Sequence, residues 1–148
     1  MAEIRMLTSM EDIDKFLREQ LSLKERAMIN TLQVAGESAV NTCRRYKGEG
    51  DYIDHTGNLR SSTGYSVVAK GTVISQSNFQ TIKKGADGSA KGKAFNTSIL
   101  PTFTKGLWLI VSAGMSYAKY VSTVHHRDVL DSAEIQAKKT LKSLMQDI

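Results

Sequence analysis

One apolar stripe near the start of the chain restricts the possible folds more than any other feature. Its members recur every three or four positions, at Met28, Leu32, Ala35, Ala39, Cys43 and Tyr46. This spacing puts them on one face of an α-helix. Polar side chains take the outward face, at Gln33, Glu37, Asn41 and Arg45. A helix with one apolar face must bury that face, and we expect it to lie on a β-sheet.

The helical pattern starts earlier, at Ser9, and contains a second start signal. Ser9 stands three residues before Asp12, as an N-cap stands before an acidic first turn. Apolar residues follow at helical spacing, at Ile13, Phe16, Leu17 and Leu21. Ser22 and Glu25 have the spacing of a capping box. We therefore predict a helical region over residues 9–47, broken once at this box and ended by a glycine-containing turn.

Residues 56–130 are predicted to hold the sheet. Alternating side chains over 65–69 and 72–75, joined by Lys70-Gly71, indicate a β-hairpin.

The most apolar part of the chain is the run 107–111, which lies between two glycines. Such a run is typical of a central strand covered on both faces, and we expect its Trp108 to be buried. A short edge strand is expected at 129–130.

The stretch 80–93 has the composition of a flexible surface loop. Small residues offer nothing to a core, and four lysines stand among them, at Lys83, Lys84, Lys91 and Lys93. Such lysines either contact nucleic acid or an acidic neighbouring subunit, or only keep the protein soluble. Residues 94–100 are expected to form a short helix that Pro101 ends.

The last element is a C-terminal helix over 131–147. It begins at an acidic start signal, Asp131 and Glu134, and its apolar stripe contains Ala133 and Ala137. The fold class that follows is α+β, a small and mainly antiparallel sheet with a long N-terminal helix packed on it and a C-terminal helix. With 148 residues, we read residues 1–148 as a single domain.

Catalytic chemistry is not predicted. Serine, histidine and aspartate are present, but none lies in a nucleophile-elbow motif. His125 and His126 would point to opposite faces of a strand and are expected to be exposed. Cys43, the only cysteine, excludes an intramolecular disulfide and is expected to be a buried, inert thiol. We expect no enzyme activity and no catalytic, cofactor-binding or metal-binding residues.

Charge and hydropathy limit the possible partners. The formal net charge of +5 permits contact with nucleic acid, but the basic residues are scattered among carboxylates. No apolar run approaches the roughly 20 residues that cross a bilayer, and Met1 is not followed by an apolar signal core. We expect no membrane contact and synthesis in the cytoplasm.

Two segments resemble those of a phage family. Thr56-Gly57-Asn58-Leu59-Arg60-Ser61-Ser62 resembles the TGNLRxS motif that follows the first helix in siphophage tail-completion and neck proteins. Gly114-Met115-Ser116-Tyr117-Ala118-Lys119-Tyr120-Val121 resembles the G-x-x-YA-x-YV segment that follows a strand in the same family. The order and separation of the two segments also agree. The chain is therefore similar to the lambdoid head–tail joining family over roughly residues 20 to 146.

The resemblance implies a structural virion protein, a tail-completion or head–tail joining subunit that forms a hexameric ring at the neck of a bacteriophage. Its partners would be copies of itself, connector or head-closure proteins, and tail-tube or tail-terminator proteins. DNA would pass through the central channel without being read. The protein would be assembled in the cytoplasm of a bacterial host and located in the virion.

Each motif residue has an expected role. Thr56 is expected to cap, Gly57 to turn, Leu59 to anchor, and Arg60 to reach a carboxylate or carbonyl of a neighbour. Tyr117 and Tyr120 would share one face of a helical turn. The expected family-motif and interface residues are Thr56, Gly57, Asn58, Leu59, Arg60, Tyr117, Ala118, Tyr120 and Val121. The expected loop contacts are Lys83, Lys84, Lys91 and Lys93.

Two other functions remain open from the residues alone. The first is a basic nucleic-acid-binding module, which strong and steeply salt-dependent DNA binding would reveal. The second is a small hydrolase that uses His125 or His126, which would lose activity when the histidine is replaced by alanine.

Overall fold

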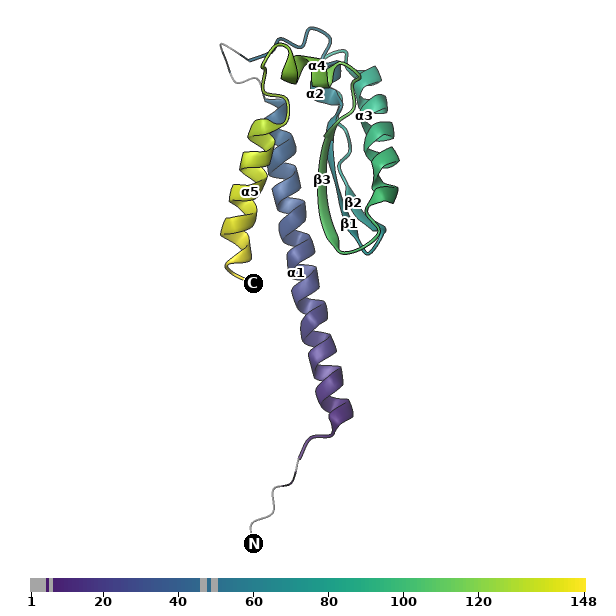
Figure 1. Ribbon diagram of the computed structural model, residues 1–148, viewed down its shortest axis with the longest axis vertical. Helices are drawn as coiled ribbons and strands as arrows, with labels where there is room; N and C mark the ends of the chain where they lie inside the picture. Colours follow the sequence, from purple (N-terminus) through teal and green to yellow (C-terminus); the bar gives the residue numbers. More distant parts are fainter. Residues whose placement is uncertain (1–4, 6, 46–47, 49–50) are drawn as a thin grey trace.

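The computed structural model describes residues 5, 7–45, 48 and 51–148, and its fold is α+β as the sequence predicts. A long N-terminal helix packs on a three-stranded antiparallel sheet, and the chain ends in a helix (Figure 1). The elements in chain order are α1 (Met10–Arg44), α2 (Asn58–Ser61), β1 (Thr63–Ala69), β2 (Thr72–Gln76), α3 (Ala86–Ile99), the 3-10 turn η1 (Leu100–Thr102), β3 (Leu107–Ala113), α4 (Ala118–Thr123) and α5 (Asp131–Met145).

The predicted break in α1 is wrong, because α1 is one helix of 35 residues. Its start is as expected, with the backbone N–H of Asp12 donating to Ser9 Oγ at 3.1 Å. Ser22 lies inside the helix, and Glu25 pairs with Lys70 at 3.8 Å instead of capping. No glycine or proline interrupts residues 10–35, so nothing opens the backbone where the box would act. The helix ends at Arg44. Tyr46, Lys47, Glu49 and Gly50, where the end of the stripe and the turn were expected, lie outside the described residues.

Only the C-terminal half of α1 belongs to the body of the protein. Its buried residues begin at Thr31 and include Leu32, Ala35, Ala39, Val40 and Cys43, so the predicted burial of Cys43 is confirmed. Figure 1 shows the sheet on one side of this half and α5, antiparallel to α1, on another. The N-terminal part of α1 extends beyond both (Figure 1).

The predicted hairpin is confirmed, but the predicted central strand is wrong. The strand order is β2-β1-β3, with Val67 of β1 opposite Leu109 of β3. All seven residues of β1 are buried, so β1 is the central strand and β3 lies at the edge. β3 is apolar because helices pack against both of its faces: Val111 contacts the α1 side, and Ile110 contacts η1. The apolar composition of β3 therefore reflects the helices that cover both of its faces, and it does not indicate a central position in the sheet.

Trp108 is not buried as expected, since 45% of its surface is exposed. Its ring lies 5.0 Å from that of Phe103, and its Nε1 donates to the backbone oxygen of Lys105 at 2.6 Å. The indole therefore contacts Phe103 and the Lys105 backbone but remains largely exposed.

The predicted loop over 80–93 is right for residues 80–85 and wrong for residues 86–93, which form the first half of α3. The buried side of α3, which faces α2 and the sheet, contains Gly88, Gly92 and Asn96. A Cβ on Gly88 would collide with the backbone of Asn58, and one on Gly92 with the backbone of Ser62. Small residues thus let the helix approach α2 and the sheet closely. The helix expected over 94–100 is the second half of α3, which ends at Ile99 ahead of Pro101.

The strand expected at 129–130 is absent; these two residues lead into α5. Val129 is 3% exposed and packs into a core cluster. The predicted C-terminal helix is confirmed as α5, and its Ala133 and Ala137 are buried. Its first turn is held by Asp128, whose Oδ1 accepts from the backbone N–H of Ser132 at 3.0 Å.

None of the helices in the described ranges is both long enough and apolar enough to cross a membrane.

Candidate functional site

The first motif, residues 56–62, folds around the carboxylate of Asp54. Asp54 Oδ1 accepts from the backbone N–H of Gly57 at 3.1 Å, and Oδ2 accepts from that of Arg60 at 2.8 Å. Gly57 has φ 80°, a left-handed conformation that favours glycine. Thr56 Oγ1 accepts from the backbone N–H of Asn58 at 3.3 Å, but the N-cap of α2 is Gly57, so the prediction that Thr56 caps is wrong. The short helix α2 therefore starts on Asp54, a residue that the motif does not include.

Arg60 reaches a carboxylate and a backbone carbonyl, as expected, and both belong to its own chain. Its Nη2 lies 2.9 Å from Asp51 Oδ2 and donates to the Tyr52 backbone oxygen at 3.2 Å. Its guanidinium carbon lies 4.1 Å from the centroid of the Tyr52 ring. Burial raises the pKa of the Tyr52 hydroxyl above its usual range. Arginine suits this place because it stays charged while one face stacks on an aromatic ring.

Asn58 and Leu59 connect the motif to two other parts of the fold. Asn58 Oδ1 accepts from the backbone N–H of Gly88 at 3.0 Å and so holds the first turn of α3. Leu59 is 2% exposed and packs in one cluster with Met115 and Ala118, which belong to the second motif. Its expected role as an anchor is confirmed.

The two motifs also meet through their backbones. The N–H of Gly114, the first residue of the second motif, donates to the oxygen of Ser62, the last residue of the first, at 3.2 Å. Segments more than 50 residues apart in the sequence therefore form one unit at the end of the sheet.

The second motif presents its tyrosines to solvent. Ala118 is buried in the cluster under α4, whereas Tyr117 and Tyr120 are exposed by more than a third. The Tyr120 ring packs edge-on against His125, with centroids 4.9 Å apart. Val121 is half-buried against the same cluster. The exposure of the two tyrosines leaves them accessible, and their role in an interface stays a prediction.

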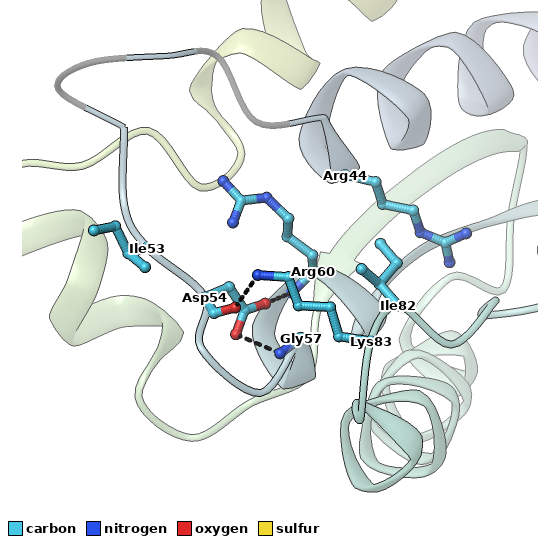
Figure 2. Close-up of a pocket in the computed structure, with 7 residues that line it drawn as sticks. All are labelled: Arg44, Ile53, Asp54, Gly57, Arg60, Ile82 and Lys83. Carbon is cyan, nitrogen blue, oxygen red and sulfur yellow. Dashed lines mark hydrogen bonds between the residues drawn. The ribbon is translucent and has the colours of Figure 1, made fainter.

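A pocket of about 370 Å³ opens beside the first motif. Figure 2 shows its lining, with Arg44 from the end of α1 and Lys83 from the turn before α3. Lys83 Nζ donates to the backbone oxygen of Asp54 at 3.0 Å, and Arg44 Nη2 donates to that of Thr63 at 2.9 Å. Burial lowers the pKa of Arg44. Both Asp54 carboxylate oxygens already accept backbone N–H groups, so this carboxylate holds the turn.

The four predicted loop lysines do not lie on one loop. Lys83 and Lys84 lie in the turn before α3, whereas Lys91 and Lys93 lie on the helix itself. Lys91 pairs with Asp87, one turn earlier on α3, at 3.0 Å. All four side chains remain exposed.

The two adjacent histidines follow α4, not a strand, and both are exposed. Across the residues that are described, no three His, Cys, Asp or Glu side chains lie close enough to hold a metal ion.

The N-terminal half of α1 is the largest feature that sequence reasoning did not single out. Phe16 and Leu17 lie on a helix, as their spacing predicts, but residues 10–28 contain no buried side chain. The large exposed apolar side chains of this segment are Met10, Phe16, Leu17, Leu21, Leu23 and Met28. We name residues 10–28 the overhang. At 1.5 Å per residue it is about 28 Å long.

Comparison with protein families, with curated proteins and with solved structures gives no match to this chain.

Proposed function

We propose that this protein is a structural virion protein of a long-tailed phage, a tail-completion or head–tail joining subunit that assembles into a ring at the neck. The observation that carries the proposal is the contact between its two motif segments. Leu59 and Ala118 share a core cluster, and Gly114 donates to Ser62. The two segments that resemble one family's motifs thus contact each other in the fold, which supports treating them as a single family signature.

The surface supports an assembly function. The sheet has two edge strands, β2 and β3, and an exposed edge is a place where another chain can add. The overhang and the tyrosines of the second motif add exposed apolar area. Contiguous apolar surface of this kind marks sites of protein contact. Head-to-tail contacts through such surfaces close into a ring, and we propose a hexamer with DNA passing through its channel.

Deleting the gene from the phage or prophage that carries it tests the proposal. We expect filled heads and complete tails that fail to join, seen by electron microscopy, and infectivity restored by a plasmid copy. Mass spectrometry of purified wild-type virions should find the protein in them. Normal infectious particles without the gene would refute the proposal.

Binding of duplex DNA by the purified protein, titrated with salt, distinguishes the alternative of a nucleic-acid-binding module. Tight binding whose affinity falls steeply with salt would favour that alternative. We expect weak binding that does not discriminate between sequences.

A further inference from the structure

The apolar stripe of the overhang continues the stripe that α5 covers. At 100° per residue, Met10, Leu17, Leu21 and Met28 fall within a band of about 40° on the α1 surface. Ala35 and Ala39, farther along α1, fall in the same band, and Ala39 packs against Ala133 and Ala137 of α5. Figure 1 shows α5 ending beside the middle of α1, so the helical cover stops while the stripe goes on.

Two charges stand at the margins of this exposed stripe. Asp14 lies on one side of the band, about one turn before Leu17, and Lys24 lies on the other side, about one turn after Leu21. Asp14 also pairs with Arg18 at 2.8 Å, farther from the band, with both side chains largely exposed. The order of residue types along the stripe is methionine, aspartate, leucine, leucine, lysine and methionine. Read in reverse, the order is the same except that aspartate and lysine change places. In an antiparallel pair, each apolar residue would therefore face an apolar residue and each charge an opposite charge.

From this pattern we infer that the overhang binds the overhang of a second copy of this chain, antiparallel and centred near residue 19. Leu17 then packs on Leu21 of the other copy, Met10 on Met28, and Asp14 faces Lys24. Each of these layers occurs twice, because the pair has a two-fold axis. The spacing is that of an antiparallel coiled coil, whose stripe residues alternate by three and four.

Charge decides the direction of the pair. A parallel pair would place Asp14 against Asp14 and Lys24 against Lys24, and like charges across an interface cost several kcal/mol. The antiparallel pair replaces both clashes with opposite charges. It also repeats the direction of α5 on α1, so the second copy extends the existing helix packing along the same face.

The pairing does not depend on the proposed phage function. A ring between head and tail is polar, whereas this pair is two-fold symmetric, so the pair would be a form of the free subunit. The overhangs would separate when a ring forms.

Sedimentation velocity of the full chain, from micromolar to near-millimolar concentration, tests the pairing. We expect a reversible dimer that Asp14→Lys and Lys24→Asp each weaken about tenfold or more. The double variant, which carries both changes, should restore dimerisation, because it exchanges the charges and keeps the composition. Glu19→Lys is the matched control, since residue 19 lies on the opposite face of α1. Circular dichroism checks that each variant keeps its helix.

Disulfide trapping tests the direction. A mixture of the Met10→Cys and Met28→Cys variants should form a mixed disulfide dimer, and neither variant alone should cross-link. The native Cys43 is 1% exposed and does not interfere. A protein that stays monomeric at all concentrations would overturn the inference. So would failure of the charge exchange to restore dimers, or cross-linking of Met10→Cys with itself.

Discussion

Arg60 Nη2 lies 2.9 Å from Asp51 Oδ2, and the two side chains are only 7% and 3% exposed. This buried ion pair joins a residue of the first motif to one outside it. Both charges are buried, so each is stabilised by the opposite charge of the other. In this chain Arg60 therefore stabilises the fold of the first motif through contacts within the chain.

Arg60→Ala should destabilise the protein by about 3–5 kcal/mol, because it removes the positive charge that compensates the buried Asp51 carboxylate. Urea unfolding followed by circular dichroism measures the free energy of unfolding. Lys138→Ala is the control: its pair with Glu134 at 2.6 Å is exposed, so its removal should leave the free energy of unfolding nearly unchanged. Equal losses in the two variants would contradict this reading of Arg60.

Gly88→Ala should destabilise the protein, although alanine favours a helix more than glycine by about 1 kcal/mol. The added Cβ would collide with the backbone of Asn58 and push α3 off α2. We expect a loss of about 1–3 kcal/mol in unfolding free energy. Lys93→Ala, on the exposed side of the same helix, should leave stability nearly unchanged. A Gly88→Ala variant that gains stability would show that α3 does not pack as described.

Tyr52→Phe should change stability at neutral pH by no more than about 0.5 kcal/mol. The ring is buried, but its hydroxyl has no hydrogen-bond partner within the described part of the chain. A loss well above this value would reveal a partner for the hydroxyl.

The same tyrosine should make the protein less stable in alkali. Burial raises the pKa of Tyr52 above the usual value of about 10. Above that pH the unfolded chain loses the phenolic proton while the folded chain keeps it, so the free energy of unfolding falls as pH rises. Tyr52→Phe should lessen this fall, measured by urea unfolding between neutral pH and about pH 11. Burial also raises the pKa of Tyr65 and Tyr117, so part of the fall should remain.

Leu17→Gln and Leu21→Gln should leave the stability of dilute protein within about 0.5 kcal/mol of the original, because both side chains are already exposed. They should nonetheless weaken self-association, which sedimentation velocity measures. Leu23→Gln removes an equally exposed leucine from the other side of α1 and should leave self-association intact. Equal self-association of all three variants would show that the stripe does not mediate dimerisation.

Much of the architecture followed from local patterns. The N-cap at Ser9, the hairpin at Lys70-Gly71 and the C-terminal helix were predicted, because hydrogen bonding and φ preference act over a few residues. Lys70 and Gly71 indeed have φ of 51° and 81°. The motif residue Leu59 was also predicted as an anchor.

Tertiary packing decided what local patterns could not. Residues 86–93 have the composition of a loop, yet they are helical because Gly88 and Gly92 fit against the backbones of Asn58 and Ser62. No sequence pattern pointed to Asp51 or Asp54, because their roles depend on tertiary contacts. Asp51 pairs with the Arg60 side chain, and Asp54 accepts two backbone N–H groups.

The sequence by itself determined the amphipathic stripe of α1, since periodicity is a property of neighbouring residues. Only the tertiary structure decided that the body covers this stripe from Thr31 onward and leaves the overhang exposed. The physical reason is that a stripe specifies a face that requires cover, whereas the length of α5 and the sheet sets how much of it one chain can cover.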